Sequence, residues 1–344
     1  MVEPGTQSPV AARPDDDAFR QLVEAHERAL RAHCYRMLGS LQDAEDQTQE
    51  TLLRAWRNLD RFESRASVRA WLYRIATNAC LDELERRGRR LLPPMLGSPS
   101  QAFSPGGGLI DETPWLEPFP DAWLEVPDAS PGPEARYETR ESIELAFVAA
   151  LQRLGPRQRA VLLLRDVCGW SARDVAGLLD VSVPAANSAL QRARARLDPA
   201  ATPTSARLAP AEERALVERY VGAWERGDVH AFAALLAEDV VLSMPPMAEW
   251  YVGAAATADF FRFVNGTGGG GPFRLVPTRA NGTLAFGFYG AGPAGPASAA
   301  FVLSVLLADT RGIRAITSFM NPRLFAPFNL PLILPASPAT LAQP

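Results

Sequence analysis

The amino-acid sequence predicts a multidomain protein in which two all-α modules precede an α+β domain with a curved antiparallel sheet. Apolar residues recur at steps of three and four through residues 18–198, except in one stretch rich in proline and glycine. Segments of period two, typical of strands, begin only after residue 238. A length of 344 residues allows two or three domains, each with its own core.

The first module, residues 18–90, is predicted to be a compact three-helix block. Its expected helices cover residues 18–38, 43–59 and 68–87. Gly39 and Ser40 end the first helix, and acidic side chains stand at the positive N-terminal pole of the second. Residues 1–17 combine prolines with acidic residues and are expected to be disordered.

Residues 91–136 form a linker that is rich in proline, glycine and acidic residues and has no periodicity. One interpretation is a disordered, solubilising tether. The other is a docked segment, which Trp115, Phe119 and Trp123 favour because three aromatic rings in nine residues are costly to leave in water.

The second module, residues 137–198, is predicted to end in a helix-turn-helix. Ser171 is expected to cap a short helix, the turn falls at residues 180–182, and the small Ala176 allows close helix crossing. The outer side of the second helix would then face the major groove and the phosphates of a duplex.

The third domain, residues 211–325, is expected to pack helices over residues 211–237 against the curved sheet. Hairpin turns are predicted at Asn281-Gly282 and at residues 309–312. The proline-rich tail, residues 326–344, is expected to be extended.

The net charge of −4 conceals two basic blocks that flank the acidic linker. The acidic isoelectric point, about 5.6, argues against a protein that coats nucleic acid nonspecifically, but local basic faces are enough for contact with a duplex.

No metal or cofactor site is expected from residue spacing. Cys34, Cys80 and Cys168 stand far apart among apolar helical residues, as reduced core thiols do. The longest apolar run, residues 299–307, is too short for a membrane span, which needs about 20 residues. No targeting signal precedes residue 18, so we expect a cytoplasmic protein without membrane contact.

Long sequence strings in both helical modules resemble extracytoplasmic-function sigma factors, the promoter-specificity subunits of bacterial RNA polymerase. DAEDQTQETLLRAW and RAWLYRIATNACLD resemble that family's region 2, and LGPRQRAVLLLRDVCGWSARDVAGLLDVSVPAANSALQRARARL resembles its region 4. Residues 211–325, with RYVGAWERGDVHAFAALLAEDVVLSMPP, EWYVG and LVPTRANG, resemble a SnoaL-like domain. Two long motifs in this order are far more specific than a lone helix-turn-helix.

The resemblance implies that the second helix docks on the clamp helices of the largest subunit of core RNA polymerase. An acidic and partly apolar surface suits this role, with Leu53 and Trp56 as anchors, whereas the alternative is a solvated acidic face. The candidate residues are Asp43, Glu45, Asp46, Gln49, Glu50, Leu53 and Trp56.

The resemblance also implies that the third helix and the loop before it open promoter DNA at the −10 element. Rings and guanidinium planes replace lost base stacking, and arginines hold the displaced phosphates. The candidates are Arg61, Arg65, Arg69, Trp71, Tyr73, Arg74 and Asn78. Trp71 either stacks on a base or belongs to the core, because it also lies on the apolar stripe.

The helix from about residue 183 to 197 would enter the major groove over the −35 element. Its candidate contacts are Ser182, Asn187, Ser188, Gln191, Arg192 and Arg194. Pro184 is tolerated in the first turn, and several alanines leave few hydrogen-bond donors, so DNA shape would share in recognition.

In this family the linker threads toward the polymerase active-site cleft and the RNA exit path. Its acidic side chains between residues 111 and 128 would mimic the charge of RNA there.

SnoaL-like domains include polyketide cyclases with acid and base groups in an apolar pocket, but this domain offers no convincing pair. His230 is expected to cap a helix or lie on the surface, and Asp239 to sit in a turn, so we assign no catalytic residue. Candidates for lining a ligand pocket are Trp224, Met244, Trp250, Tyr251, Phe286 and Phe301, although core packing accounts for most of them.

The hypothesis is therefore a promoter-binding sigma factor whose SnoaL-like domain regulates it through intramolecular contacts or a small ligand. A bifunctional protein with a small-molecule enzyme at its C-terminus is one alternative. An ordinary helix-turn-helix regulator is another, but it leaves residues 43–90 unexplained.

Overall fold

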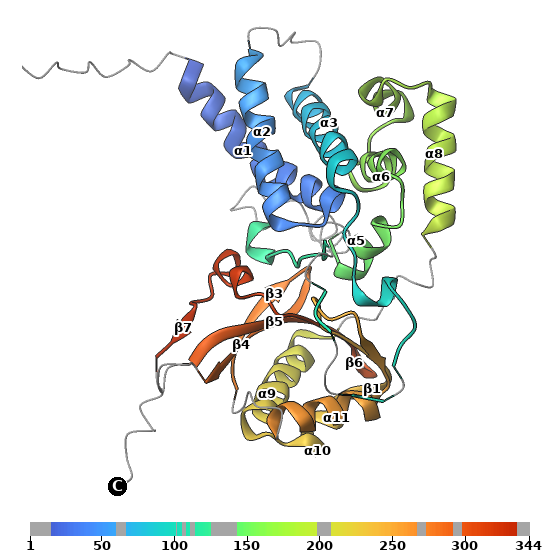
Figure 1. Cartoon of the computed structure of the whole chain (residues 1–344). Coiled ribbons are helices and arrows are strands. Elements are labelled where there is room, and N and C mark those ends of the chain that lie inside the picture. Colours follow the sequence, from blue (N-terminus) through green and yellow to red (C-terminus); the bar gives the residue numbers. More distant parts are fainter. Residues whose placement is uncertain are drawn as a thin grey trace, which may run out of the picture.

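A computed structural model gives the structure of the protein (Figure 1). It describes residues 15–59, 67–100, 102–104, 108–110, 114–124, 143–197, 208–266, 273–291 and 298–335. None of the helices within these ranges is long and apolar enough to cross a membrane.

The first module has the three predicted helices. They are α1 (Asp15–Leu38), α2 (Leu41–Arg57) and α3 (Val68–Arg87). The Ser40 and Ser67 hydroxyls cap α2 and α3 by accepting hydrogen bonds from the backbone N–H groups of Asp43 and Ala70. Tyr35, Met37 and Cys80 are fully buried in the shared core.

The second module contains the predicted helix-turn-helix. Its helices are α5 (Leu145–Leu151), α6 (Pro156–Leu162) with a π-helical turn (Leu163–Val167), α7 (Ala172–Leu179) and α8 (Val183–Arg196). Ser171 and Ser182 cap α7 and α8, and Asp180 takes the left-handed conformation (φ 52°) that turns the chain between them.

The C-terminal domain is the predicted α+β fold, with one correction to its sheet. Its helices are α9 (Pro210–Arg226), α10 (Val229–Ala233) and α11 (Ala254–Asn265). The strands are β1 (Leu236–Ser243), β2 (Trp250–Val252), β3 (Arg274–Ala280), β4 (Thr283–Ala291), β5 (Ser298–Asp309), β6 (Gly312–Phe319) and β7 (Ile333–Leu334). Their order is β2-β1-β6-β5-β4-β3, with β7 on β5, and β1 pairs parallel with β6, so the sheet is mixed rather than antiparallel.

The two faces of the sheet pack into different hydrophobic cores. Helices α9, α10 and α11 cover one face, and the helical modules lie on the other (Figure 1). Because side chains alternate along a strand, Phe286 and Phe288 of β4 belong to the core under α9–α11, whereas Ala285 and Tyr289 belong to the core that continues into the helical modules. The three parts are therefore packed into one body.

Residues 326–335 of the tail stay on the C-terminal domain, which corrects the expected boundary at residue 326, whereas residues 336–344 lie outside the described residues. Phe328 and Leu330 are buried, and β7 pairs with β5. Gly287 makes room for this packing, since a Cβ there would come within 2.8 Å of Leu330. The folded domain therefore includes the tail at least as far as residue 335, the last residue that the structure describes.

The described parts of the linker are docked, as their aromatic residues predicted. Leu116 and Phe119 are fully buried, and Arg31 lies over the ring of Trp123 at 4.8 Å. Backbone N–H groups of Ser100 and Ile110 donate to carbonyls of the C-terminal domain at 2.8 and 2.9 Å. The linker thus contacts both the first module and the C-terminal domain.

Candidate polymerase and promoter surfaces

One exposed face of α2 collects four of the residues predicted to bind polymerase. Asp46, Gln49, Leu53 and Trp56 recur at helical spacing, and the two apolar members are 49% and 40% exposed. The Trp56 ring packs on Phe19 of α1, with centroids 4.9 Å apart. Glu45 and Glu50 are half-buried beside this face, and Glu50 is paired with Arg54 at 2.7 Å.

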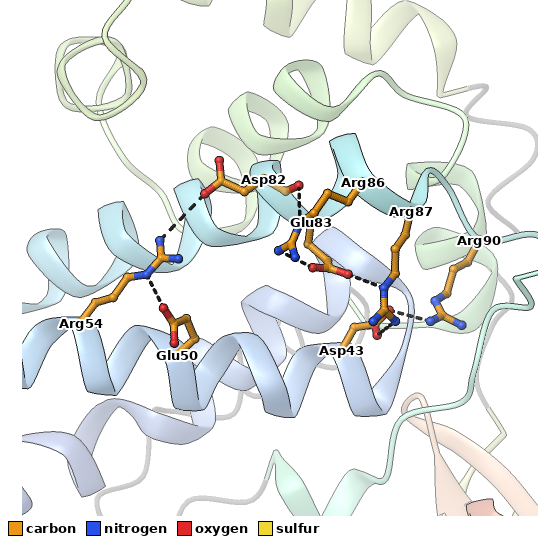
Figure 2. A network of polar contacts seen from close by, with 8 residues as sticks. All are labelled: Asp43, Glu50, Arg54, Asp82, Glu83, Arg86, Arg87 and Arg90. Atoms are coloured by element: carbon orange, nitrogen blue, oxygen red, sulfur yellow. Dashed lines mark hydrogen bonds and ion pairs between the residues drawn. The ribbon is translucent and has the colours of Figure 1, made fainter.

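Asp43 does not belong to that exposed face. It is only 6% exposed, and its carboxylate accepts hydrogen bonds from Arg87 at 3.0 Å and Arg90 at 2.6 Å (Figure 2). Glu83 is likewise buried between Arg86 and Arg87. The acidic start of α2 is therefore neutralised by the basic end of α3, and Asp43 stabilises the module instead of facing a partner.

The predicted −10 residues on α3 differ in exposure. Arg69 and Asn78 are exposed, whereas Trp71 is half-buried against the core and Tyr73 is only 4% exposed. Burial raises the pKa of Tyr73, so its hydroxyl keeps its proton at neutral pH. Arg61 and Arg65 lie outside the described residues.

Helix α3, which carries the predicted −10 residues, packs against the helix-turn-helix. The Arg74 guanidinium donates to the Gly177 carbonyl of α7 at 2.6 Å. The Tyr73 ring lies 5.5 Å from the ring of Trp170, just before α7. Two of the side chains predicted to meet the −10 element are therefore engaged within the protein.

All the predicted −35 residues lie exposed on or beside α8. Amide, hydroxyl and guanidinium groups face solvent there, on Asn187, Ser188, Gln191 and Arg192. Such groups can form hydrogen bonds with base edges and phosphates. Ser182 is the N-cap of α8, and Arg194 is paired with Asp166 at 2.7 Å.

Asn281 joins all three parts of the chain. It stands fully buried at the tip of the β3–β4 hairpin, in the left-handed conformation (φ 54°) that the predicted turn requires. Its side-chain amide donates to the Tyr35 hydroxyl at 3.0 Å and to the Ile143 carbonyl at 2.7 Å, and its Oδ1 accepts from the Phe119 backbone N–H at 2.8 Å. These partners belong to α1, to the chain entering α5 and to the linker.

Neighbouring contacts reinforce this junction. The Tyr35 hydroxyl donates to the Glu117 carbonyl at 2.7 Å, and burial raises the pKa of Tyr35, so the donor proton is retained. The Gly282 N–H donates to Asp121 at 2.7 Å. The sequence predicted the turn at Asn281-Gly282 but gave no signal for these partners, because asparagine is common in such turns for backbone reasons alone.

Arg159 is a second buried connection, and no sequence pattern pointed to it. It is 1% exposed in α6, and its guanidinium donates to the Met37 carbonyl of α1, to the Gln152 side chain at 2.9 Å and to the Leu154 carbonyl at 3.4 Å. Burial lowers its pKa to about 10, which still leaves it charged at neutral pH.

A cavity of about 210 Å³ lies in the C-terminal domain between the inner face of the sheet and the helices. Of the predicted pocket residues, Trp224, Met244 and Phe301 line it. Tyr251 and Phe286 are buried in the surrounding core without lining it, and the Trp250 indole N–H donates to the Gly97 carbonyl of the linker. His230 is exposed at the start of α10, and exposed Asp239 pairs with Arg314.

Comparisons with known proteins agree with this arrangement of modules. Family models for sigma-70 region 2, sigma-70 region 4 and the SnoaL-like domain match residues 22–90, 144–197 and 217–319. The chain belongs to the extracytoplasmic-function RNA polymerase sigma factors, which direct polymerase to promoters, and it carries a C-terminal SnoaL-like domain.

Among individual proteins, the chain is similar to the ECF RNA polymerase sigma factor SigG of Mycobacterium tuberculosis (strain ATCC 25618 / H37Rv). The two are 42% identical over 336 residues, which cover 96% of this chain and 88% of that protein. SigE of Mycolicibacterium smegmatis is 31% identical over 188 residues, 54% of this chain and 62% of its own length. The crystal structure of the Mycobacterium tuberculosis sigma factor SigJ shares the fold, with a TM-score of 0.57 and 24% identity over 91% of this chain and 99% of that one.

Proposed function

We propose that this sigma factor occupies a closed form held by its own SnoaL-like domain, and that it must open to bind a promoter. The observation that carries this proposal is the Asn281 junction, at which one buried side chain bonds α1, the linker and the chain entering α5. Breaking the closed form therefore means withdrawing the β3–β4 hairpin from both helical modules.

The closed form must open because the promoter has two separate elements to be bound. The −10 and −35 elements are separate stretches of DNA, and the region 2 and region 4 modules each bind one of them. In the closed form Arg74 and Tyr73 of α3 are engaged with α7 and Trp170. Binding both elements at once requires α3 and α7 to separate.

We propose that the α2 face formed by Asp46, Gln49, Leu53 and Trp56 docks on the clamp helices of the polymerase's largest subunit. Exposed apolar anchors within a charged rim are typical of such interfaces. The exposed donors of α8 are proposed to read the −35 element, and Arg69 and Asn78 the −10 element. We propose that the protein acts in the cytoplasm, together with these partners.

We assign the SnoaL-like domain a regulatory role rather than a catalytic one. The cavity-lining side chains within the described residues are aromatic, aliphatic, thioether and hydroxyl groups. They offer no carboxylate, imidazole or amine for acid–base work, so the lining favours binding over turnover.

The polymerase dock is tested by removing its apolar anchors. Leu53→Ala with Trp56→Ala should weaken binding to core polymerase by about 30-fold or more and reduce promoter-specific transcription in vitro to match. Leu332→Ala removes a more exposed leucine side chain from the C-terminal domain and should leave both unchanged. Equal core binding by the double variant and the parent chain would contradict the assignment, and no promoter-specific transcript from the parent would contradict the sigma-factor role itself.

The closed form is tested by locking the junction with a reversible disulfide. Pro120 and Ala280 are paired across an antiparallel bridge, so cysteines at both positions are close enough to be joined. The oxidised protein should lose most of its promoter output and regain it on reduction. A disulfide between Val241→Cys and Val252→Cys, partners within the C-terminal domain, should have no such effect. Full transcription from the locked protein would refute the proposal.

A further inference from the structure

The linker meets α2 at the N-terminal end of that helix. The Leu41 N–H donates to the Glu117 carboxylate of the linker at 2.7 Å, and the Glu117 N–H donates to the carbonyl of Gly39, just before α2, at 3.0 Å. In the first turn, Asp43 is held by arginines at and beyond the end of α3. The contacts that fix α2 in the closed form are therefore gathered at its first turn.

The apolar anchors of the proposed polymerase-binding face lie toward the other end of α2. Leu53 and Trp56 are about 18 and 22 Å from Leu41 along the helix, because each residue adds about 1.5 Å. This end of α2 is directed away from the C-terminal domain (Figure 1). Along its length α2 packs chiefly on α1 and α3, the other helices of its own module.

The exposure of these anchors belongs to the closed form itself. Leu53 is 49% and Trp56 40% exposed with the linker, the second module and the C-terminal domain packed in place. Asp46 and Gln49 are exposed in the same arrangement. Closing the chain therefore leaves the α2 face open to a protein partner.

The next helix of the same module is restrained in the closed form. On α3, the Arg74 guanidinium is bonded to the Gly177 carbonyl of α7, and the Tyr73 ring lies against Trp170. Both side chains are among those predicted to meet the −10 element. One module thus has its predicted promoter side chains engaged within the chain while its polymerase-binding face is uncovered.

We infer that the closed sigma factor binds core RNA polymerase through the α2 face, and that the C-terminal domain controls promoter engagement after this complex has formed. The inference rests on the proposed function, which supplies both the closed form and the role of the α2 face. A partner that binds two forms equally does not shift the equilibrium between them. Polymerase on the α2 face alone therefore leaves the chain closed, whereas a promoter that engages both modules favours the open form.

Binding of the locked protein to immobilised core polymerase tests the first part. The protein with the Pro120–Ala280 disulfide should bind with a dissociation constant within about threefold of that of its reduced form. Leu53→Ala with Trp56→Ala, added to the oxidised protein, should weaken this binding about 30-fold or more. Leu332→Ala in the same oxidised protein is the control and should bind like the locked parent.

The step at which the chain opens is tested by measuring the distance between α3 and α8 in three states. Spin labels at Glu85→Cys and Ala195→Cys, in a Cys168→Ala background, report it by double electron–electron resonance. The distance should be equally short in the free protein and in its complex with core polymerase, and it should lengthen when promoter DNA is added to that complex. A longer distance with core polymerase alone would overturn the inference.

The outcomes separate this inference from the closed-form proposal. If the oxidised lock lost both transcription and more than about tenfold of its affinity for core polymerase, and regained both on reduction, the closed form would stand and the inference would fall. Core binding by the oxidised lock that did not depend on Leu53 and Trp56 would also overturn the inference. Full transcription from the oxidised lock would refute the closed form, and the inference with it.

Discussion

Replacing Asn281 with glycine should open the protein and raise its promoter output. Glycine keeps the left-handed backbone of the hairpin turn but removes the bonds to the Tyr35 hydroxyl, the Ile143 carbonyl and the Phe119 N–H. Three buried hydrogen bonds of about 1 kcal/mol each give about 3 kcal/mol, or a shift of about 100-fold toward the open form. In vitro transcription at limiting sigma factor should rise about three- to tenfold.

Asn329 provides the matched control. It has the same left-handed conformation (φ 55°) but is exposed, so Asn329→Gly removes an asparagine at φ > 0 without touching the junction. Its transcription should equal that of the parent chain, and far-ultraviolet circular dichroism should show the same helix content in all three proteins. If Asn281→Gly transcribed no better than Asn329→Gly, the junction would not restrain the sigma modules.

Replacing Arg159 with methionine should destabilise the contact between the two helical modules. Methionine fills similar space but leaves the Met37 and Leu154 carbonyls and the Gln152 side chain without their charged donor. Breaking a buried charged network typically costs about 3 kcal/mol or more. The first thermal transition, followed by calorimetry, should move down by several degrees, and protease cleavage within residues 143–155 should accelerate.

Arg157 lies two residues away in α6 with its side chain exposed. Arg157→Met makes the same chemical change at the surface. It should change the free energy of unfolding by less than about 0.5 kcal/mol. Similar behaviour of the two variants would mean that the buried guanidinium contributes nothing specific to the contact between the modules.

The sequence predicted the helical modules well because helix caps and apolar periodicity depend on residues that are close together in the chain. Ser67 and Gly88 bound α3 where the sequence placed its ends, and Ser171 caps α7 as expected. The Asn281-Gly282 turn was equally predictable, since both residues must adopt φ > 0. The parallel pairing of β1 with β6 was not, because it depends on which distant strands meet.

Whether a single residue lies on the surface or in the core was harder to predict from the sequence. The exposed α2 and α8 faces follow from helical periodicity, but Asp43 and Tyr73 are buried by partners from other elements, Arg87, Arg90 and Trp170. The tail from residue 326 is proline-rich, yet it folds onto the sheet because Gly287 leaves space for Leu330. Such long-range packing leaves no pattern in the chain's local composition.

The distance between α3 and α8 tests the closed form most directly. Spin labels at Glu85→Cys and Ala195→Cys, both exposed positions without an assigned role, report it by double electron–electron resonance in a Cys168→Ala background. We predict one short, narrow distance distribution for the free protein and a clearly longer distance in the complex with core polymerase and promoter DNA. Asn281→Gly should populate the longer distance without either partner. An identical distribution for the free protein and the transcribing complex would contradict the account.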